Sequence, residues 1–580
     1  MTRPRYLIAV AEDERLLKQA RAMLDRAAGP AFRLILDEQR VLLMTCGEQA
    51  LAVPGVGAVI GPVHDPNGVV GAERSTLKTA AESRGRSLID DHWGGYVALI
   101  LGRAPDEVEV VRAPLGDLPC YWARVGGLHL LSSDLSLMRA AELPLPLLDA
   151  AALARHLARE DLRTSETCLG GVHELRGGER MTLGRGGMDQ SILWSPWTFA
   201  SRERQLTDPA DAANMVRDAA FHCVAARAAT FNPILLKLSG GLDSSIVAAC
   251  LKQSGAAFDA LNLVTENPAG DEREHASVVA RAAGVPLLEH YRNPAKVDLR
   301  HSDAFRLPRP TARAFTQESR RIAGQVAAEL GSQAVFDGGG GDNIFCSLNS
   351  ARPAADCLLA APEQFRESCA SIARLAQASI AQVAWRAWRT KLRRNPAYAW
   401  GADMRFLSRA AVAEAEKAPA HPWLTAPGDA LPGKAAHVAL IAAAQSVAEG
   451  FDAEDELPVY SPLISQPLVE TCLRVPSWLW FERGLNRAVA RRAFSKCLPL
   501  ETVQRRSKGA PDCFIAELFE VNRPAIRTML MDGALRREGL LDVVALETAL
   551  DDQAPVEGHD YLRIMQLVDA EAWATAWTAS

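Results

Sequence analysis

The sequence lacks the residue patterns of zinc-binding, disulfide-rich and membrane proteins. Its 11 cysteines are scattered singly from Cys46 to Cys513 without a CxxC pair, so neither a zinc ribbon nor a disulfide framework is indicated. The histidines show no HExxH or similar ligand spacing, which argues against catalytic zinc. No signal-peptide core and no run of 18 apolar residues occurs. We therefore expect a cytoplasmic protein with no membrane association.

An excess of charge of one sign is also missing. The 64 Lys and Arg residues against 70 Asp and Glu residues leave a net charge of −6, which gives no global attraction to nucleic acid, so any site for a polyanion must be local. A chain of 580 residues with 48% hydrophobic residues is too long for one core and too apolar for extensive disorder. Length alone suggests about four domains, but the residue patterns along the sequence indicate two.

Residues 1–200 and 208–580 differ in pattern, and we predict a domain in each. The first range has short apolar runs between glycine-rich turns, such as 41–45 and 97–102, which is typical of antiparallel sheet. In the second range strands alternate with helices, as in parallel βαβ units, and from about residue 355 the pattern is mostly helical. The fold class is therefore α/β, with 195–209 as the preferred linker.

A glycine turn between a strand and a helix is the most informative segment. It reads ILLKLSGGLDSSIVAACLKQ over residues 234–253. Gly240 and Gly241 let consecutive backbone N–H groups face an anion, and the helix that follows adds its positive N-terminal end. Ser239, Ser244 and Ser245 can donate hydroxyls to phosphate. Asp243 would repel phosphate unless it acted through a bound Mg²⁺. The lysine of a Walker A loop is absent.

The string SGGLDSS resembles the PP-loop of the ATP pyrophosphatases, and more narrowly that of the asparagine synthetase family. The resemblance implies an adenine-nucleotide α-hydrolase-like domain with a parallel sheet and many helices. It also implies ATP and Mg²⁺ as cofactors, with a carboxylate activated as an acyl-adenylate and pyrophosphate released. A strand-to-helix turn that merely contains two glycines is the alternative.

A second glycine-rich loop, AVFDGGGGDNIF at 334–345, resembles the family's SGEGxDE string. By that match Asp342 shares the magnesium with Asp243, while Asp337 and Gly338 meet the nucleotide. Gly339 departs from the pattern, because asparagine and β-lactam synthetases carry a glutamate there, so the role of that carboxylate in the amide-forming step cannot be transferred. A flexible surface loop is the alternative.

Residues 486–512 resemble the family's C-terminal signature, and the match makes Lys508 the catalytic lysine, which would stabilise negative charge on phosphorus and then on the acyl centre. Arg487 and Arg491 either bind phosphate or peptide, or are solvated helix charges. Asp271, Glu272 and Glu274 either touch ribose, metal or amine, or cap a helix.

The basic run 384–396 contains five cations and two tryptophans. We expect an amphipathic helix with its tryptophans inward. The alternatives are a dock for an acidic precursor or for a partner protein, and RNA binding.

The N-terminal segments 91–103 and 111–141 resemble the class II glutamine amidotransferase domain, an Ntn-type antiparallel β-sandwich. That domain uses an N-terminal cysteine, but Thr2 stands here, and the glutamine-binding NHGEIYN-like segment is missing. We therefore expect a degenerate scaffold that supplies no ammonia, so that the nucleophile is an amine already present on the substrate.

The adenylating core and the degenerate N-terminal domain, together with the strings FDGGGGDN (336–343), GDEREHA (270–276) and SPLISQPLVETCLRVP (461–476), resemble the lasso-peptide macrolactam synthetases. The resemblance implies adenylation of an Asp or Glu side chain of a ribosomal precursor peptide and attack by the peptide's N-terminal amine. A leader-peptide-binding protein and a leader protease are the implied partners. Within the same chemistry, β-lactam synthetase and glutamine-independent asparagine synthetase are alternatives. A tRNA-modifying PP-loop enzyme is disfavoured by the acidic balance, and a catalytically dead binding protein by the presence of Asp243, Asp342 and Lys508.

Overall fold

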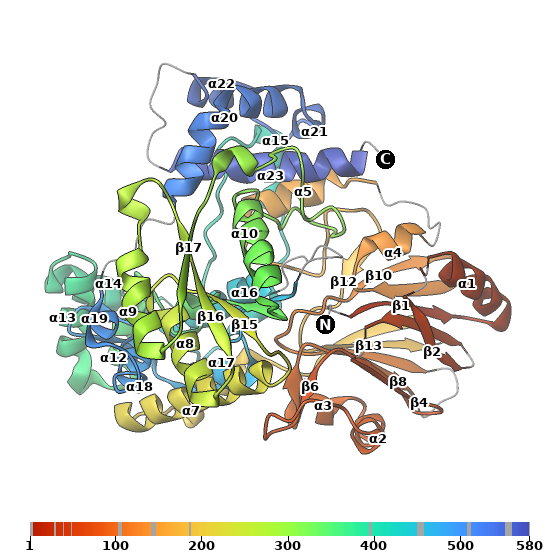
Figure 1. Cartoon of the computed structure of the whole chain (residues 1–580), viewed down its shortest axis with the longest axis horizontal. Coiled ribbons are helices and arrows are strands. Elements are labelled where there is room, and N and C mark those ends of the chain that lie inside the picture. The colour runs from red at the N-terminus through yellow and green to blue at the C-terminus, as the bar shows by residue number, and fades with distance from the viewer. Residues whose placement is uncertain are drawn as a thin grey trace.

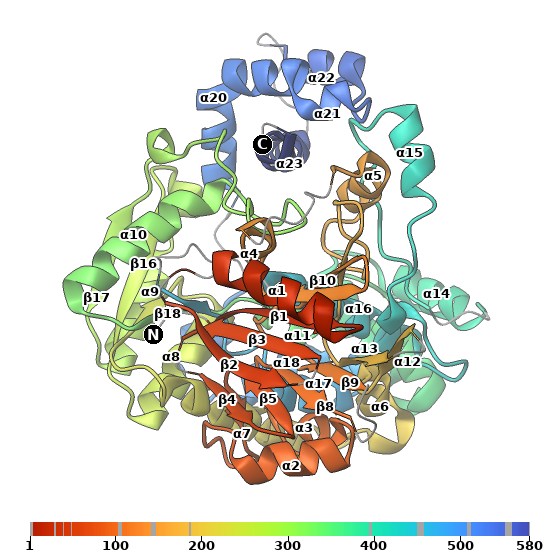
Figure 2. The ribbon, with the colours of Figure 1, turned by 90° about the vertical axis from the view of Figure 1, so that its right-hand side faces the viewer.

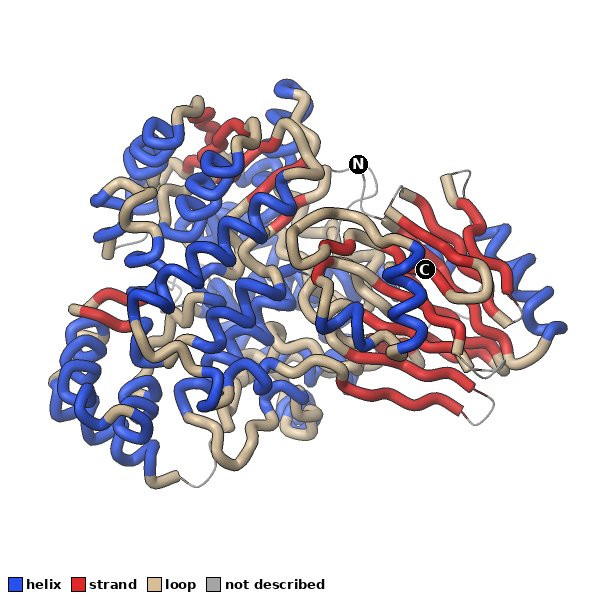
Figure 3. The backbone as a smooth tube through the Cα atoms, turned by 90° about the horizontal axis from the view of Figure 1, so that it is seen from below, coloured by secondary structure: helices blue, strands red, loops and turns tan. Residues whose placement is uncertain are grey.

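The computed structural model is an α/β protein in which strands and helices are unevenly shared between two halves (Figure 1). It describes residues 4–27, 29, 31–38, 40–47, 49–102, 107–140, 147–184, 187–393, 397–448, 457–506, 512–551 and 559–578. Viewed from below, the long strands of the N-terminal half gather on one side and the helices of the C-terminal half on the other (Figure 3).

Two six-stranded antiparallel sheets form the N-terminal half. The first has the order β12-β10-β11-β1-β3-β2, with β1 at Arg5–Ala11, β2 at Arg33–Glu38, β3 at Val41–Cys46, β10 at Tyr121–Val125, β11 at Leu128–Ser132 and β12 at Val172–Glu174. The second has the order β14-β13-β9-β8-β5-β4, with β4 at Ala50–Val53, β5 at Gly57–Ile60, β8 at Val97–Leu101, β9 at Val108–Arg112, β13 at Glu179–Gly184 and β14 at Gly187–Ile192. The predicted antiparallel sandwich is confirmed.

Side chains that alternate along each strand fill the space between the two sheets. Tyr6, Ile8 and Val10 of β1 share one buried cluster with Val97 and Leu99 of β8, as expected when every second residue of a strand faces the core. Helix α1 (Glu14–Ala27) contacts β1 and β3 on the outer face of the first sheet (Figure 2). Helix α2 (Arg74–Glu82) contacts the second sheet and is followed by α3 (Arg86–Asp90).

A five-stranded parallel sheet organises the C-terminal half. Its order is β17-β16-β15-β18-β19, with β15 at Ile234–Lys237, β16 at Phe258–Val264, β17 at Leu287–Tyr291, β18 at Ala334–Phe336 and β19 at Val459–Tyr460. Every neighbouring pair is parallel. Helix α7 (Pro209–Ala228) precedes β15, and α8 (Leu242–Ser254), α9 (Arg273–Ala283) and α10 (Phe315–Leu330) lie between successive strands from β15 to β18.

Hydrophobic residues cover both faces of this sheet, as parallel sheets require. Leu235 and Val335 pack with Ile322 and Val326 of α10 on one face. On the other face, Leu236 and Phe336 belong to the large cluster that includes α7 and α8. β15 and β18 are parallel neighbours, and each is followed by one of the two glycine-rich loops. The two loops therefore leave the sheet side by side at the same edge.

The rest of the C-terminal half is mainly helical, as predicted. Its helices are α11 (Gly341–Ile344), α12 (Arg352–Ala360), α13 (Phe365–Leu375), α14 (Ile380–Lys391), α15 (Arg409–Ala415), α16 (Pro432–Ala448), α17 (Gln466–Arg474), α18 (Ala488–Ala493), α19 (Leu500–Gln504), α20 (Cys513–Asp532), α21 (Ala534–Arg537), α22 (Val543–Ala549) and α23 (Asp560–Thr578). None of the helices in the described part of the chain has the length and hydrophobicity needed to cross a bilayer.

A buried ion cluster joins the two halves. Glu174 at the end of β12 bonds to Arg112 of the same half at 2.8 Å, and also pairs with Arg309, which lies in the C-terminal half between β17 and α10. All three side chains are almost fully buried. Removing one member would leave a buried charge without its partner, which costs about 3–5 kcal/mol.

The tryptophans of α14 do not point inward, contrary to our expectation. Trp385 and Trp388 are 54% and 52% exposed, while Val383 and Ala387 form the buried face of the helix. Arg389 lies over the ring of Trp385, 4.6 Å from its centroid. The helix buries small residues against its neighbours and leaves its aromatic ones in solvent.

Candidate active site

The turn after β15 has a shape that only glycine permits. Gly240 has φ of +69°, and a Cβ atom there would lie 2.4 Å from the carbonyl carbon of His275. Gly241 is the N-cap residue of α8, and residues 241–244 line the cavity described below, so the N-terminal end of this helix lies at that cavity. The turn is thereby an anion-binding cradle at a helix N-terminus.

The three serines of this turn have different surroundings. Ser239 and Ser244 lie with their hydroxyl oxygens 3.2 Å apart, and both residues line the cavity. Ser245 is fully buried and donates its hydroxyl to the carbonyl oxygen of Gly241 at 2.7 Å. The structure therefore places Ser239 and Ser244 where a phosphate could be bound, whereas Ser245 holds the turn together.

The second glycine-rich loop lies directly against the first. A Cβ atom on Gly338 would come within 2.5 Å of the backbone nitrogen of Ser244, and one on Gly341 within 2.5 Å of the Cγ atom of Asp243. The glycine run thus allows close contact between the two loops, which is the physical reason for its composition. A flexible surface loop, the alternative considered above, does not describe it.

Arg487 lies between the two carboxylates assigned to the metal. Its Nη1 atom is 2.9 Å from Asp243 Oδ2 and 2.6 Å from Asp342 Oδ1. Its backbone has φ of +54°, a strained conformation for a residue with a side chain. The side chain is only 12% exposed, so Arg487 is part of the site and not a solvated helix charge.

Asp243 and Asp342 suit a magnesium ion held partly by nucleotide. Both carboxylates reach the same guanidinium nitrogen, so they lie close enough together to share one cation. Among the described residues no group of three or more His, Cys, Asp or Glu side chains could enclose a metal by itself. Mg²⁺ is usually bound by one or two carboxylates together with phosphates and water. The pair fits that pattern.

A cavity of about 360 Å³ opens beside these loops, and its lining is strongly basic. The cations that line it are Lys237, Arg487, Arg491, Arg505 and Arg506, whereas Asp243 and Asp337 are its acidic lining residues. Such a surplus of positive charge suits a polyphosphate. Burial, with the nearby charge of Arg487, lowers the pKa of Arg491 to about 10, so this side chain remains a cation at neutral pH.

Arg505 lines this cavity and is paired with Glu272. Arg505 donates to Glu272 at 2.9 Å, and its Nε and Nη1 atoms are buried without a hydrogen-bond partner in the described part of the chain. A phosphate oxygen would satisfy those donors. Asp271 instead pairs with Arg273 and accepts the backbone N–H of that residue at 3.0 Å, which is the helix-capping alternative. No contact in the described structure gives Glu274 a role.

Sequence reasoning did not single out Lys237, Arg505, Arg506, Thr502 or Ser461. Arg505 and Arg506 stand inside the quoted C-terminal signature, which was the available signal. For Lys237, the available signal was its position as a charged residue within the apolar run that precedes the glycine turn. Thr502 also stands inside that signature, and Ser461 is the first residue of the string SPLISQPLVETCLRVP at 461–476. Lys508 and Thr2 lie outside the described residues, so the structure does not place the predicted catalytic lysine.

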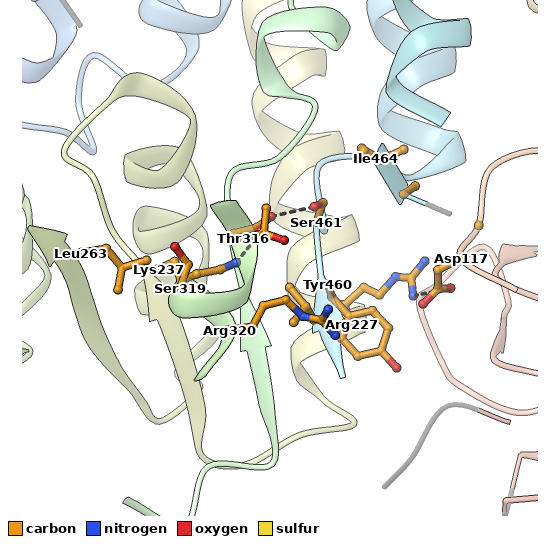
Figure 4. Close-up of a pocket in the computed structure, with 14 residues that line it drawn as sticks. Asp117, Arg227, Lys237, Leu263, Thr316, Ser319, Arg320, Tyr460, Ser461 and Ile464 are labelled. Carbon is orange, nitrogen blue, oxygen red and sulfur yellow. Dashed lines mark hydrogen bonds and ion pairs between the residues drawn. The ribbon is translucent and has the colours of Figure 1, made fainter. Parts of the chain in front are cut away.

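A second cavity, of about 340 Å³, lies where the two halves of the molecule meet (Figure 4). Gly116 and Asp117 of the N-terminal half line it together with Arg227 of α7 and Tyr460 of β19. Arg227 lies within 3.9 Å of Asp117. Lys237 and Asp337 line this cavity and the basic one alike, so the two spaces adjoin at that pair.

Three contacts hold the carboxylate of Asp337 at the boundary between the two cavities. Its Oδ2 atom is 3.2 Å from Lys237 Nζ, and its Oδ1 atom accepts the Ser461 hydroxyl at 2.6 Å and the Gly339 N–H at 2.9 Å. Burial by itself would raise the pKa of Asp337, but the Lys237 ammonium and the Ser461 hydroxyl hold it below its ordinary value. The carboxylate is therefore ionised at neutral pH.

The parallel sheet, the anion-binding turn at its carboxyl edge and the facing carboxylates define a nucleotide-binding α/β enzyme. Residues 215–575, more than half of the sequence, match the family described as asparagine synthase. The chain belongs to this family of ATP-dependent amide-forming ligases.

Two solved structures that resemble the chain are only remotely similar to it. One is described as the allosteric regulatory enzyme of purine biosynthesis, with 8% identity, a TM-score of 0.22, and 50% of this chain and 80% of that chain covered. Another is the glutamine phosphoribosylpyrophosphate amidotransferase from B. subtilis complexed with ADP and GMP, with 9% identity, a TM-score of 0.20, and 59% and 77% covered. No curated protein sequence matches the chain.

Proposed function

We propose that this enzyme closes a macrolactam ring in a peptide, as a lasso-peptide cyclase does. In the first step, ATP adenylates an Asp or Glu side chain of a ribosomal precursor peptide and pyrophosphate leaves. In the second step, the peptide's own N-terminal amine attacks the acyl carbon, the amide bond forms and AMP departs. The protein would act in the cytoplasm, beside a leader protease and a leader-peptide-binding protein.

The arrangement of the two cavities supports this proposal. A peptide acid held in the cavity between the halves would lie beside a nucleotide held in the basic cavity, because both spaces contact Lys237 and Asp337. Holding both ends of one peptide there replaces a bimolecular collision by a high effective concentration, which is worth about 7–11 kcal/mol in well-oriented reactions.

The residues of the basic cavity have distinct roles in the first step. Ser239, Ser244 and the N–H groups that begin α8 would bind phosphate, together with Gly338 in the facing loop. Asp243 and Asp342 would hold Mg²⁺, which when bound neutralises the phosphate charge as pyrophosphate leaves. Arg491, Arg505 and Arg506 line the same cavity and would stabilise that departing pyrophosphate.

Loss of one water from a peptide is the test. The protein would be incubated with ATP, Mg²⁺ and synthetic peptides that carry a free N-terminal amine and one internal Asp or Glu, and the products followed by mass spectrometry. A product lighter by 1 water (about 18 Da), formed together with AMP and resistant to linear sequencing, is expected. Amide formation from free aspartate and ammonia, or β-lactam formation from a small β-amino acid, would replace the proposal by one of the alternatives.

A further inference from the structure

The network around Asp337 fills the space that a side chain at position 339 would need. A Cβ atom on Gly339 would lie 2.4 Å from the Ser461 hydroxyl oxygen and 2.9 Å from Asp337 Oδ1. In the family string that this loop resembles, a glutamate stands at this position, and Gly339 provides no carboxylate there. The carboxylate of Asp337 lies beside this position instead.

Asp337 is available to a ligand although it is held firmly. A carboxylate offers about four acceptor positions. Among the described residues, Lys237, Ser461 and the Gly339 N–H take three of them. The side chain is 24% exposed, and it lines both cavities. One acceptor position therefore remains on a side chain that lines both cavities, where a nucleophile from the second cavity would meet an acyl-adenylate formed in the first.

We propose that Asp337 replaces the missing glutamate as the group that contacts the attacking amine and takes its proton, and that Lys237 and Ser461 position it. The inference rests on the proposed function, since it concerns the second step of that reaction. Asp337 would be a catalytic residue, whereas Lys237 and Ser461 would act through it.

The step balances without any further reactant. The lone pair of the neutral amine forms the C–N bond, and the bond from the acyl carbon to the AMP oxygen breaks with its electron pair on AMP. One N–H proton passes to a carboxylate oxygen of Asp337 and then to solvent. The nitrogen becomes far more acidic as the C–N bond forms, so a carboxylate whose pKa is held low still accepts this proton.

Kinetic measurements can distinguish a role of Asp337 in amide formation from a role in nucleotide binding. Adenylation is followed by ATP–pyrophosphate exchange driven by an accepted peptide, and by hydroxylamine trapping of the acyl-adenylate as a hydroxamate. Hydroxylamine is small and uncharged at neutral pH and can lose its proton to buffer. Amide formation by the peptide's own amine instead needs a group in place at the site.

The deciding experiment compares Asp337→Asn with wild type and with Asp218→Asn, an exposed control on α7. We expect Asp337→Asn to keep exchange and hydroxamate formation within about threefold and to lose amide formation by about 100-fold or more. Unchanged amide formation would overturn the proposal. An equal loss of all three activities would also overturn it, and would assign Asp337 to nucleotide binding.

Two further variants keep the test decisive if Asp337→Asn does not fold. Ser461→Ala removes the 2.6 Å hydrogen bond, and Gly339→Ala would displace the Ser461 hydroxyl. Each is expected to lower amide formation about tenfold with exchange retained, and equal loss of both activities would contradict the assignment. Failure of the proposed function itself is distinguishable, because wild type would then show no exchange with any acid-bearing peptide.

Discussion

Arg487 joins Asp243 to Asp342 through one guanidinium nitrogen, at 2.9 and 2.6 Å. The cation stands between two carboxylates that are expected to share a divalent metal. Binding of a nucleotide with Mg²⁺ therefore requires Arg487 to exchange its carboxylate partners for phosphate oxygens, a change that its position in the basic cavity allows.

Arg487→Ala is expected to separate metal binding from catalysis. Loss of the competing cation should raise the affinity of the free enzyme for Mg²⁺ at least threefold by calorimetry, while pyrophosphate release falls at least tenfold because a phosphate contact is lost. Arg492→Ala is a matched control, because Arg492 lies on α18, the helix that Arg487 caps, and pairs with the partly exposed Glu482 outside the basic cavity. An unchanged Mg²⁺ affinity would contradict the arrangement.

Asp243→Asn and Asp342→Asn should each abolish pyrophosphate release, with a loss of about 100-fold or more, because each removes one charge from the metal site without changing its size. Pyrophosphate release would be measured at saturating ATP and Mg²⁺. Full turnover in either variant would refute the metal assignment for that residue.

Gly338→Ala should disrupt the contact between the two loops. The added methyl group meets the backbone nitrogen of Ser244 at 2.5 Å, so the loops must separate. We expect at least tenfold weaker ATP binding in a fluorescence titration. Gly324→Ala within α10 is the control, since nothing lies within 4 Å of its new methyl group, and it should stabilise the fold by about 0.5–1 kcal/mol. Normal ATP affinity in Gly338→Ala would show that the loops do not jointly hold nucleotide.

Lys508→Ala should leave ATP binding intact and reduce amide formation by about 100-fold, because the charge that stabilises the acyl centre is lost. Equilibrium dialysis with ATP and product analysis by mass spectrometry measure the two quantities. Thr2→Ala should be nearly silent, since no ammonia has to be generated. Unchanged product in Lys508→Ala would remove that lysine from the mechanism.

Buried His437 should make stability depend on pH. Burial, together with the nearby charge of Lys434, lowers the pKa of His437 to about 3, whereas an unfolded histidine titrates near pH 6.5. The unfolded chain thus binds more protons below pH 6.5, so this group's contribution to stability is full above that pH and is lost as the pH falls towards 3.

The matched comparison is His437→Gln, in which the carbonyl of Ile344, 2.9 Å from His437 Nε2, can still accept a hydrogen bond. Between pH 6.5 and 4.5, the free energy of unfolding measured in urea should fall less in the variant than in wild type, by up to about 1.4 kcal/mol per pH unit. Equal slopes would show that His437 takes up its proton normally in the folded state.

Much of the fold and the centre of the site could be predicted from the sequence. The glycine turn after β15 needs backbone angles and close approaches that leave few alternatives, so Gly240 and Asp243 could be identified from local pattern. Asp342 was identified from the resemblance of the loop after β18 to the family string. β15 and β18 are neighbours although β16 and β17 come between them in the chain, so the two loops meet where the strand order of the sheet reverses.

Other features depend on contacts between segments far apart in the sequence. Ser461 follows the edge strand β19, and no local pattern relates it to Asp337, 124 residues away. The tryptophans of α14 were expected inside because apolar residues usually are. The helix instead uses Val383 and Ala387 for packing, and periodicity alone does not tell which stripe of a mixed helix meets its neighbours.

The most direct test of the account is a crystal structure with Mn²⁺ in place of Mg²⁺ and a non-hydrolysable ATP analogue. The account predicts an anomalous peak at about 2.0–2.3 Å from both Asp243 and Asp342, with the triphosphate against Ser239 and Ser244. Nucleotide bound elsewhere, or a metal ion that contacts neither carboxylate, would contradict it.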